Sequence, residues 1–213
     1  MVANLDEAKD FALAGGAALI IRGDVDRSTR DLDFFGLAAD DVDRLAPVVM
    51  LALLDAGLEV RTVQENPGFV RLEISSSSDT TELDLAADAR ILPAEHGSLV
   101  PTLAGEELAT DKVLAVFGRA EARDFVDLRA VESRYGLRRL CERATEKDPG
   151  FSIEVFNDML NRFSRLRRDE FELDNSAFAD LRNVVGEWRH RVLELVHDQT
   201  QGRGKERDTG LGL

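Results

Sequence analysis

The sequence predicts an α+β fold in which strands and helices mix in the first half and helices alone form the second. Residues 1–100 contain short stretches of alternating apolar and polar residues, which are typical of half-buried strands. Residues 101–200 instead repeat apolar residues about every 3.6 positions, as helices do. Charge changes as well, because residues 1–100 hold 8 basic and 19 acidic side chains whereas residues 101–213 hold 19 and 22. We therefore expect an α/β core over residues 1–100, a helical region over 101–200 and a disordered, glycine-rich tail over 201–213.

The first half divides into short elements. A lead-in over residues 5–13, either a helix or a passage from helix to strand, ends at the Gly15-Gly16 pair, and helices follow over 17–22 and 40–56. The apolar side of the longer helix consists of Val42, Leu45, Val49, Leu53 and Leu54. Strands are expected at 28–35, 58–63, 69–75 and 80–86, and Ser75–Ser78 marks a hairpin turn between the last two.

The second half is expected to be a set of helices reached through a proline-punctuated connector over residues 89–103. The helices are expected at 106–117, 122–134, 137–146, 152–163 and 176–197. Ser152 suits the N-cap of the fourth helix, with Val155 and Phe156 facing inward. Cys141 follows a leucine and is expected to be a small buried apolar residue.

Composition excludes several classes of protein. With 213 residues, 44% hydrophobic and 32% charged, the chain is long and mixed enough for a globular core. It contains no apolar run of the roughly 18 residues that a membrane span requires. The single cysteine excludes an intramolecular disulfide and a multi-cysteine zinc site. The acidic start lacks the basic and apolar regions of a signal peptide, so we expect a cytoplasmic protein with no membrane partner.

Two aspartates carry the clearest chemical signal. Asp31 and Asp33 are two apart in a predicted strand, so they project from one face of it. Carboxylates this close repel one another unless a cation lies between them, and hard oxygen ligands suit Mg²⁺. Asp84 lies between two leucines in another predicted strand and is the candidate third carboxylate, with Glu82 in reserve.

Each of these features also has a purely structural interpretation. An Asp-x-Asp pair in an acidic protein is usually solvated surface, and a Gly-Gly pair is more often a turn than a phosphate cradle. A lone aspartate in a strand usually faces outward. The combination is more specific, because the pair of glycines, the short helix, the Asp-x-Asp strand and the later aspartate follow in one order.

Two stretches of the chain resemble the AbiEii/MenT nucleotidyltransferases, which are toxins of bacterial toxin–antitoxin systems with a DNA-polymerase-β-like core. The first stretch is LAGGAAL at 13–19 with Arg22 and RSTRDLDFF at 27–35. The second is LATDK at 108–112, Arg119 and RDFVDL at 123–128. The resemblance covers residues 13–128 and implies a polymerase-β-like nucleotidyltransferase core with a mixed β-sheet, followed by a helical C-terminal region.

The resemblance implies a role for each matching residue in the first half. Asp31, Asp33 and Asp84 would hold the Mg²⁺ ions, and Asp84 would also help to deprotonate the attacking hydroxyl. Gly15 and Gly16 would let the backbone approach a triphosphate, and the helix beginning near Ala17 would present its free N–H groups. Ala17 departs from the many relatives that have Ser or Thr there, and this removes a hydroxyl that could touch a phosphate.

In the second half, the resemblance assigns Lys112 and Asp127 to the catalytic residues. Lys112 would supply a compact positive charge to the nucleotide, and Arg119 would reach the phosphates. Asp127 would either orient Lys112 or contact the nucleotide, and the sequence does not choose between these roles. Without the motif, Lys112 would be interpreted as a lysine that extends from a helix to place its charge in water.

The function implied is a toxin that adds nucleotides, expected to be pyrimidines from CTP or UTP, to the 3′ end of tRNA. This addition would block aminoacylation and translation, and a cognate antitoxin would neutralise the enzyme. An arginine-rich stretch favours RNA, since residues 119–168 hold 12 basic and 9 acidic side chains, although ordinary solvated helices would look the same. The alternatives are transfer to a small molecule or a protein, and a non-catalytic module that binds a partner. The identity of the NTP, the acceptor, the antitoxin mechanism and the oligomeric state are not set by the sequence.

Overall fold

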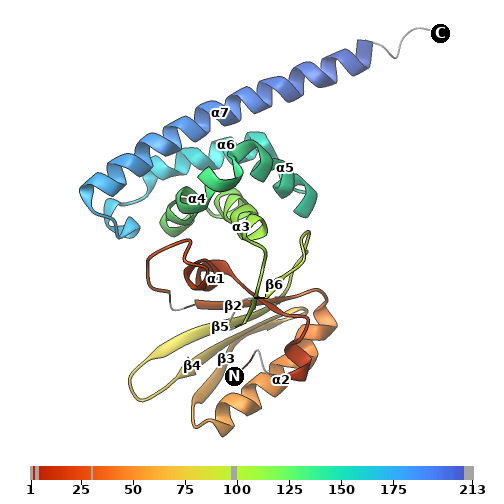
Figure 1. The fold of residues 1–213 in the computed structure, drawn as a ribbon, viewed down its shortest axis with the longest axis vertical. Helices are drawn as coiled ribbons and strands as arrows, with labels where there is room; N and C mark the ends of the chain where they lie inside the picture. The colour runs from red at the N-terminus through yellow and green to blue at the C-terminus, as the bar shows by residue number, and fades with distance from the viewer. Residues whose placement is uncertain (1, 3–4, 30, 97–99, 209–213) are drawn as a thin grey trace, which may run out of the picture. The chain divides into compact units, whose positions relative to one another are not determined.

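The computed structural model describes residues 2, 5–29, 31–96 and 100–208, and the chain forms two compact units (Figure 1). The first unit is Met1–Leu108 and the second is Ala109–Leu213. We expected a boundary between residues 100 and 101, and the division falls slightly later, inside helix α3 (Gly105–Gly118). None of the described helices is both long enough and apolar enough to cross a membrane.

The first unit is an α/β unit built on one sheet. Its helical elements are the short 3-10 helix Asp6–Ala8, α1 (Gly15–Ile21) and α2 (Ala39–Asp55). Its strands are β1 (Ala12–Ala14), β2 (Asp31–Gly36), β3 (Glu59–Asn66), β4 (Phe69–Ser75), β5 (Thr80–Ala87), β6 (Glu95–His96) and β7 (Pro101–Thr102).

The sheet is mixed, as the family resemblance implies. In the described part of the chain it has seven strands in the order β3-β4-β5-β2-β1-β7-β6. Strand β2 runs antiparallel to β1 and parallel to β5, and β4 runs antiparallel to β5. The predicted hairpin turn joins β4 to β5, where the N–H of Ser76 donates to the carbonyl of Asp79 at 2.8 Å. This order places β2 beside β5, although the two strands are far apart in the sequence.

One face of the sheet is apolar and packs on α2 (Figure 1). Alternate residues of β4 and β5 are buried on this side, namely Val70, Leu72, Ile74, Leu83 and Leu85. Helix α2 contributes Val42, Leu45, Val49 and Leu53. Leu54 was expected on the same side, but it is 50% exposed, because one step of about 100° around the helix turns it away from Leu53. The intervening residues of the strands lie on the opposite face.

The second unit is helical, as predicted. Beyond α3 it contains α4 (Ala122–Tyr135), α5 (Leu137–Lys147), α6 (Ile153–Leu160), the 3-10 helices Asn161–Arg165 and Arg168–Phe171, and α7 (Asn175–Asp208). Ser152 caps α6 as predicted, since its hydroxyl accepts the N–H of Val155 at 3.3 Å. Phe156 is buried, but Val155 is 45% exposed, so its predicted inward orientation is wrong.

Aromatic side chains and a buried ion pair form the core of this unit. Trp188 of α7 is fully buried, and the ring of Phe163 lies 5.3 Å from Phe125 and 5.0 Å from Phe171. Lys147 Nζ of α5 donates to Asp111 Oδ1 of α3 at 2.5 Å. A buried lysine needs such a partner, so this pair fixes α5 against α3.

Several boundaries differ from those expected. Helix α1 starts at Gly15 rather than at 17, and β2 starts at Asp31 because the N–H of Asp31 donates to the Thr29 hydroxyl at 3.3 Å before the strand begins. Strands β6 and β7 fall in the predicted connector, and each is too short to show alternation. Helix α7 continues to Asp208, into the segment predicted as a tail, and residues 209–213 lie outside the described part.

Cys141 is buried, as expected, and we predict that its thiol does not react in the folded protein. Burial, helped by the charge of Glu142, raises the pKa of the thiol to about 12, so it stays protonated at pH 8. We expect a thiol reagent to modify Cys141 about 10²-fold more slowly in the native protein than in urea. Equal rates would show that the α5 region opens freely.

Candidate active site

The two predicted aspartates project from the polar face of the sheet. Asp31 and Asp33 alternate along β2 with Leu32 and Phe34, and Phe34 is buried in the apolar core. In the parallel pairing with β5, Asp33 lies opposite Asp84, and Asp31 lies opposite Glu82. Since paired residues of neighbouring strands share a face, the structure places the three predicted carboxylates on one surface of the sheet.

Gly15 lies directly against this surface. It follows β1, where Ala14 pairs with Asp33, and its φ of +60° lies in the left-handed region that favours glycine. A Cβ at this position would lie 1.8 Å from Asp33 Oδ2. At Gly16 a Cβ would meet only the flexible end of Arg27, 2.5 Å away. Gly15 therefore has a specific function, which is to make room for the Asp33 carboxylate.

Replacing Gly15 by alanine should displace Asp33. We expect a stability loss of about 1–2 kcal/mol from the positive φ, together with a loss of about 10²-fold in any activity that uses Asp33. Gly57→Ala is the matched control, because Gly57 has a φ of +80° but no atom within 4 Å of a Cβ. The two variants should lose similar stability in urea unfolding, and only Gly15→Ala should lose activity. Equal activity in both would mean that the Asp33 position is not critical.

Asp84 is held by an arginine that sequence reasoning missed. Arg71 on β4 pairs with Asp84 in register, and its Nε and Nη2 donate to the two carboxylate oxygens at 2.7 and 2.6 Å. The bonds to Asp84 raise the pKa of the Arg71 guanidinium above its ordinary value, against the opposing effect of burial. The hairpin register could have predicted this contact. In an antiparallel pair, a turn that sets Ser75 opposite Thr80 also sets Arg71 opposite Asp84.

The carboxylates fit a divalent cation in chemical type and in register. Their hard oxygen atoms are the ligands that Mg²⁺ prefers, and Asp31 and Asp33 come from alternate positions of one strand. Within the described residues, however, no three His, Cys, Asp or Glu side chains are gathered closely enough to hold a metal ion. Both oxygens of Asp84 are instead bonded by Arg71.

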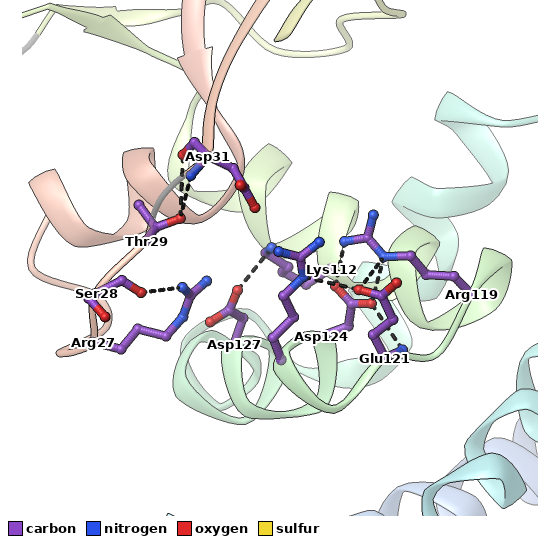
Figure 2. Close-up of polar contacts among 10 residues, drawn as sticks. Arg27, Ser28, Thr29, Asp31, Lys112, Arg119, Glu121, Asp124 and Asp127 are labelled. Atoms are coloured by element: carbon purple, nitrogen blue, oxygen red, sulfur yellow. Dashed lines mark hydrogen bonds and ion pairs between the residues drawn. The ribbon is translucent and has the colours of Figure 1, made fainter. Parts of the chain in front are cut away.

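Loop residues before β2 are also engaged in polar contacts. Figure 2 shows Thr29 bonded to the backbone of Asp31, and Arg27 Nη1 donates to the carbonyl of Ser28 at 2.9 Å. Arg22, a further residue of the first motif, bonds Asp24 and Glu95. The bond from Arg22 holds the pKa of the Glu95 carboxyl below its usual value. Arg22 therefore stabilises the segment around β6.

In the second unit, the predicted lysine and aspartate form a buried ion pair. Lys112 Nζ of α3 lies 2.9 Å from Asp127 Oδ2 of α4, and the two side chains are 8% and 0% exposed (Figure 2). Lys112 therefore does not extend to water, which rules out the interpretation as an ordinary surface lysine. Of the two roles left open for Asp127, this contact supports the orientation of Lys112.

Arg119 is bonded to a different acid. Its Nε and Nη2 each donate to Asp124 at 2.9 Å, and Asp124 also accepts the N–H of Glu121 at 3.2 Å as part of the capping box of α4 (Figure 2). Arg123, the next basic residue of the motif, donates to Glu121 at 3.1 Å. Asp124 is fully buried, so in this arrangement Arg119 neutralises the Asp124 carboxylate that caps α4, and the predicted contact of Arg119 with phosphate stays a prediction.

Comparison with known proteins bears on the family of the chain and on its fold. The family model described as nucleotidyl transferase AbiEii toxin, type IV toxin–antitoxin system, matches residues 2–206. Among solved structures, MenT4, a nucleotidyltransferase toxin from Mycobacterium tuberculosis, matches 70% of this chain with a TM-score of 0.51 and 20% identity. The chain spans 57% of the length of that MenT4 chain.

A second solved structure, JHP933 from Helicobacter pylori, matches 93% of this chain and 90% of its own, with a TM-score of 0.45 and 16% identity. No curated protein matches the sequence significantly. At 20% identity the MenT4 match shows the fold alone. The family model carries the assignment, because it spans nearly the whole chain. The chain belongs to the AbiEii family of nucleotidyltransferase toxins from type IV toxin–antitoxin systems.

Proposed function

We propose that this protein transfers a nucleotide from an NTP to the 3′ end of tRNA and thereby stops translation. The observation that carries the proposal is the set of carboxylates of β2 and β5 in register, with Gly15 leaving room beside Asp33. Family membership supports the nucleotidyl transfer. The choice of tRNA, and of CTP or UTP as donor, rests on the sequence resemblance.

In this reaction the carboxylates of the first unit bind a divalent cation. Asp31, Asp33 and Asp84 are the proposed ligands, and Mg²⁺ is the proposed ion. When bound, the ion supplies positive charge to the α-phosphate and to the departing pyrophosphate. Asp84 also accepts the proton of the attacking hydroxyl, whose oxygen bonds the α-phosphorus as pyrophosphate leaves. Gly15, Gly16 and Ala17 carry no large side chain, so they leave room for the triphosphate.

The second unit contributes positive charge. Lys112, which Asp127 orients, is proposed to neutralise charge on the triphosphate. Arg119 is proposed to leave Asp124 and to bond a phosphate of the nucleotide in its place. The arginines proposed for tRNA backbone contact are Arg134, Arg138, Arg139, Arg143, Arg162, Arg165, Arg167 and Arg168. Arg143 and Arg167 already bond Glu146 and Asp169, so RNA binding by these two would replace carboxylates with phosphates.

The decisive experiment is label transfer. The purified chain, Mg²⁺ and each α-labelled NTP are incubated with total tRNA and, separately, without RNA. We expect label at the 3′ end of tRNA with CTP or UTP, and no label with Asp33→Asn. Label on the protein itself would indicate protein nucleotidylation, and NTP binding without transfer would indicate a different acceptor.

Toxicity is the second part of the proposal. A toxin should slow growth when it is produced alone, and a cognate antitoxin should restore growth. Normal growth of cells that produce an active wild-type chain would contradict this part without affecting the nucleotidyl transfer.

A further inference from the structure

An arginine stands among the carboxylates proposed for the metal site. Arg71 of β4 bonds both oxygens of Asp84 of β5. Its Nε also lies 3.6 Å from Oε2 of Glu82, which is on β5 as well. Asp33 lies beside Asp84 in the neighbouring strand. A guanidinium that bonds a carboxylate bidentately occupies both of its oxygens. Asp84 can therefore turn fully to a metal ion only when Arg71 releases it.

Arg71 balances the charge of the neighbouring carboxylates, and its side chain is more exposed than that of Asp84. Carboxylates on adjacent strands repel one another, so the face needs positive charge when no metal is bound. The Arg71 side chain is 35% exposed, whereas that of Asp84 is 14% exposed. The Arg71 guanidinium also lies 5.7 Å from the centre of the Phe69 ring, at the exposed side of β4. The guanidinium is therefore on the more exposed side chain of the pair, and the carboxylate on the less exposed one.

We propose that Arg71 is a built-in counter-ion that competes with the divalent cation for Asp84, so that the metal binds by displacing the guanidinium. The inference rests on the proposed function, because it concerns the same metal site. It assigns to Arg71 a role that the sequence motifs do not contain: Arg71 sets how tightly the site binds its metal. Arg71 is a positioning residue, since it acts through Asp84.

Mn²⁺ binding to the full chain without nucleotide tests the proposal, with free Mn²⁺ measured by electron paramagnetic resonance. Arg71→Gln should tighten binding about tenfold, because the ion then no longer has to displace the charge-assisted bidentate contact that Arg71 makes with Asp84. In an Asp84→Asn background the same substitution should change affinity by less than about twofold, because the contested ligand is gone. Unchanged or weaker binding in Arg71→Gln, or an equal gain in the Asp84→Asn background, would overturn the proposal.

Arg61→Gln is the matched control for net charge. Arg61 bonds Glu73 at 2.9 Å across β3 and β4, and Glu73 is not a proposed ligand, so Mn²⁺ affinity should stay within about twofold of wild type. If Arg71→Gln fails to fold, Arg71→Lys replaces it in the test. Lysine keeps the positive charge but cannot bond both oxygens of Asp84 in the same way, so Mn²⁺ binding should tighten about threefold. An unchanged Mn²⁺ affinity in Arg71→Lys would count against the proposal. If Asp33→Asn binds Mn²⁺ as wild type does, the proposed metal site is wrong. If Asp33→Asn weakens Mn²⁺ binding but Arg71→Gln leaves it unchanged, the metal site stands and only the role proposed for Arg71 is wrong.

Discussion

Asp33→Asn should abolish nucleotide transfer while leaving the fold intact. Asparagine has the shape of aspartate but lacks the negative charge that a divalent cation requires, so the α-phosphate loses its main electrostatic partner. We expect transfer to fall by about 10³-fold or more in the label assay. Circular dichroism and urea unfolding should match wild type within about 0.5 kcal/mol, because the substitution lies on the polar face of the sheet and removes no core contact.

The control for Asp33→Asn is Glu73→Gln. Glu73 lies on β4, in the same alternation as Arg71, and it bonds Arg61 away from the proposed ligands. The substitution changes net charge by the same amount and should leave transfer within about twofold of wild type. Full activity in both Asp33→Asn and Asp31→Asn would contradict the metal assignment, and the carboxylates would then be surface residues of a binding module.

The polar face of the sheet could be predicted because it depends on local alternation. The spacing of Asp31 and Asp33, and the position of Asp84 between two buried leucines, each determine a face without reference to distant residues. Bringing Asp31, Asp33 and Asp84 together also requires β2 to lie beside β5. Only the family resemblance implied that the three aspartates form one site. Arg71 was missed because a charged residue on a strand is usually solvated surface. Only the register of the hairpin distinguishes it from Arg61.

The contact between Lys112 and Asp127 illustrates what local patterns cannot determine. Both residues belong to a motif, but they lie on different helices, and the motif permits either a direct pair or two separate nucleotide contacts. The choice depends on how α3 packs against α4, which is a tertiary property. The same reasoning applies to Arg119, which looked like a phosphate ligand but bonds Asp124, because the buried carboxylate that caps α4 needs a counter-charge. Short strands such as β6 carry too few residues for any pattern.

Breaking the Lys112–Asp127 pair should separate its contribution to stability from its contribution to catalysis. Lys112→Met leaves the fully buried Asp127 without this partner, and loss of one member of a buried pair costs about 3–5 kcal/mol. We expect this loss in urea unfolding followed by fluorescence of Trp188, the single tryptophan, which is buried in the same unit. Nucleotide transfer should fall by about 10²-fold, measured well below the unfolding transition.

The double variant Lys112→Met/Asp127→Leu decides between the two contributions. Apolar side chains of similar size can replace a buried ion pair with little net cost, so most of the lost stability should return. Transfer should stay low, because the positive charge proposed for the triphosphate is still missing. Lys147→Met is the matched control, since Lys147 pairs with Asp111 at 2.5 Å in the same unit and its side chain is 2% exposed. It should lower stability and leave transfer by the folded enzyme unchanged. If the double variant instead regains transfer together with stability, Lys112 is a structural residue, and the positive charge that serves the nucleotide comes from elsewhere in the chain.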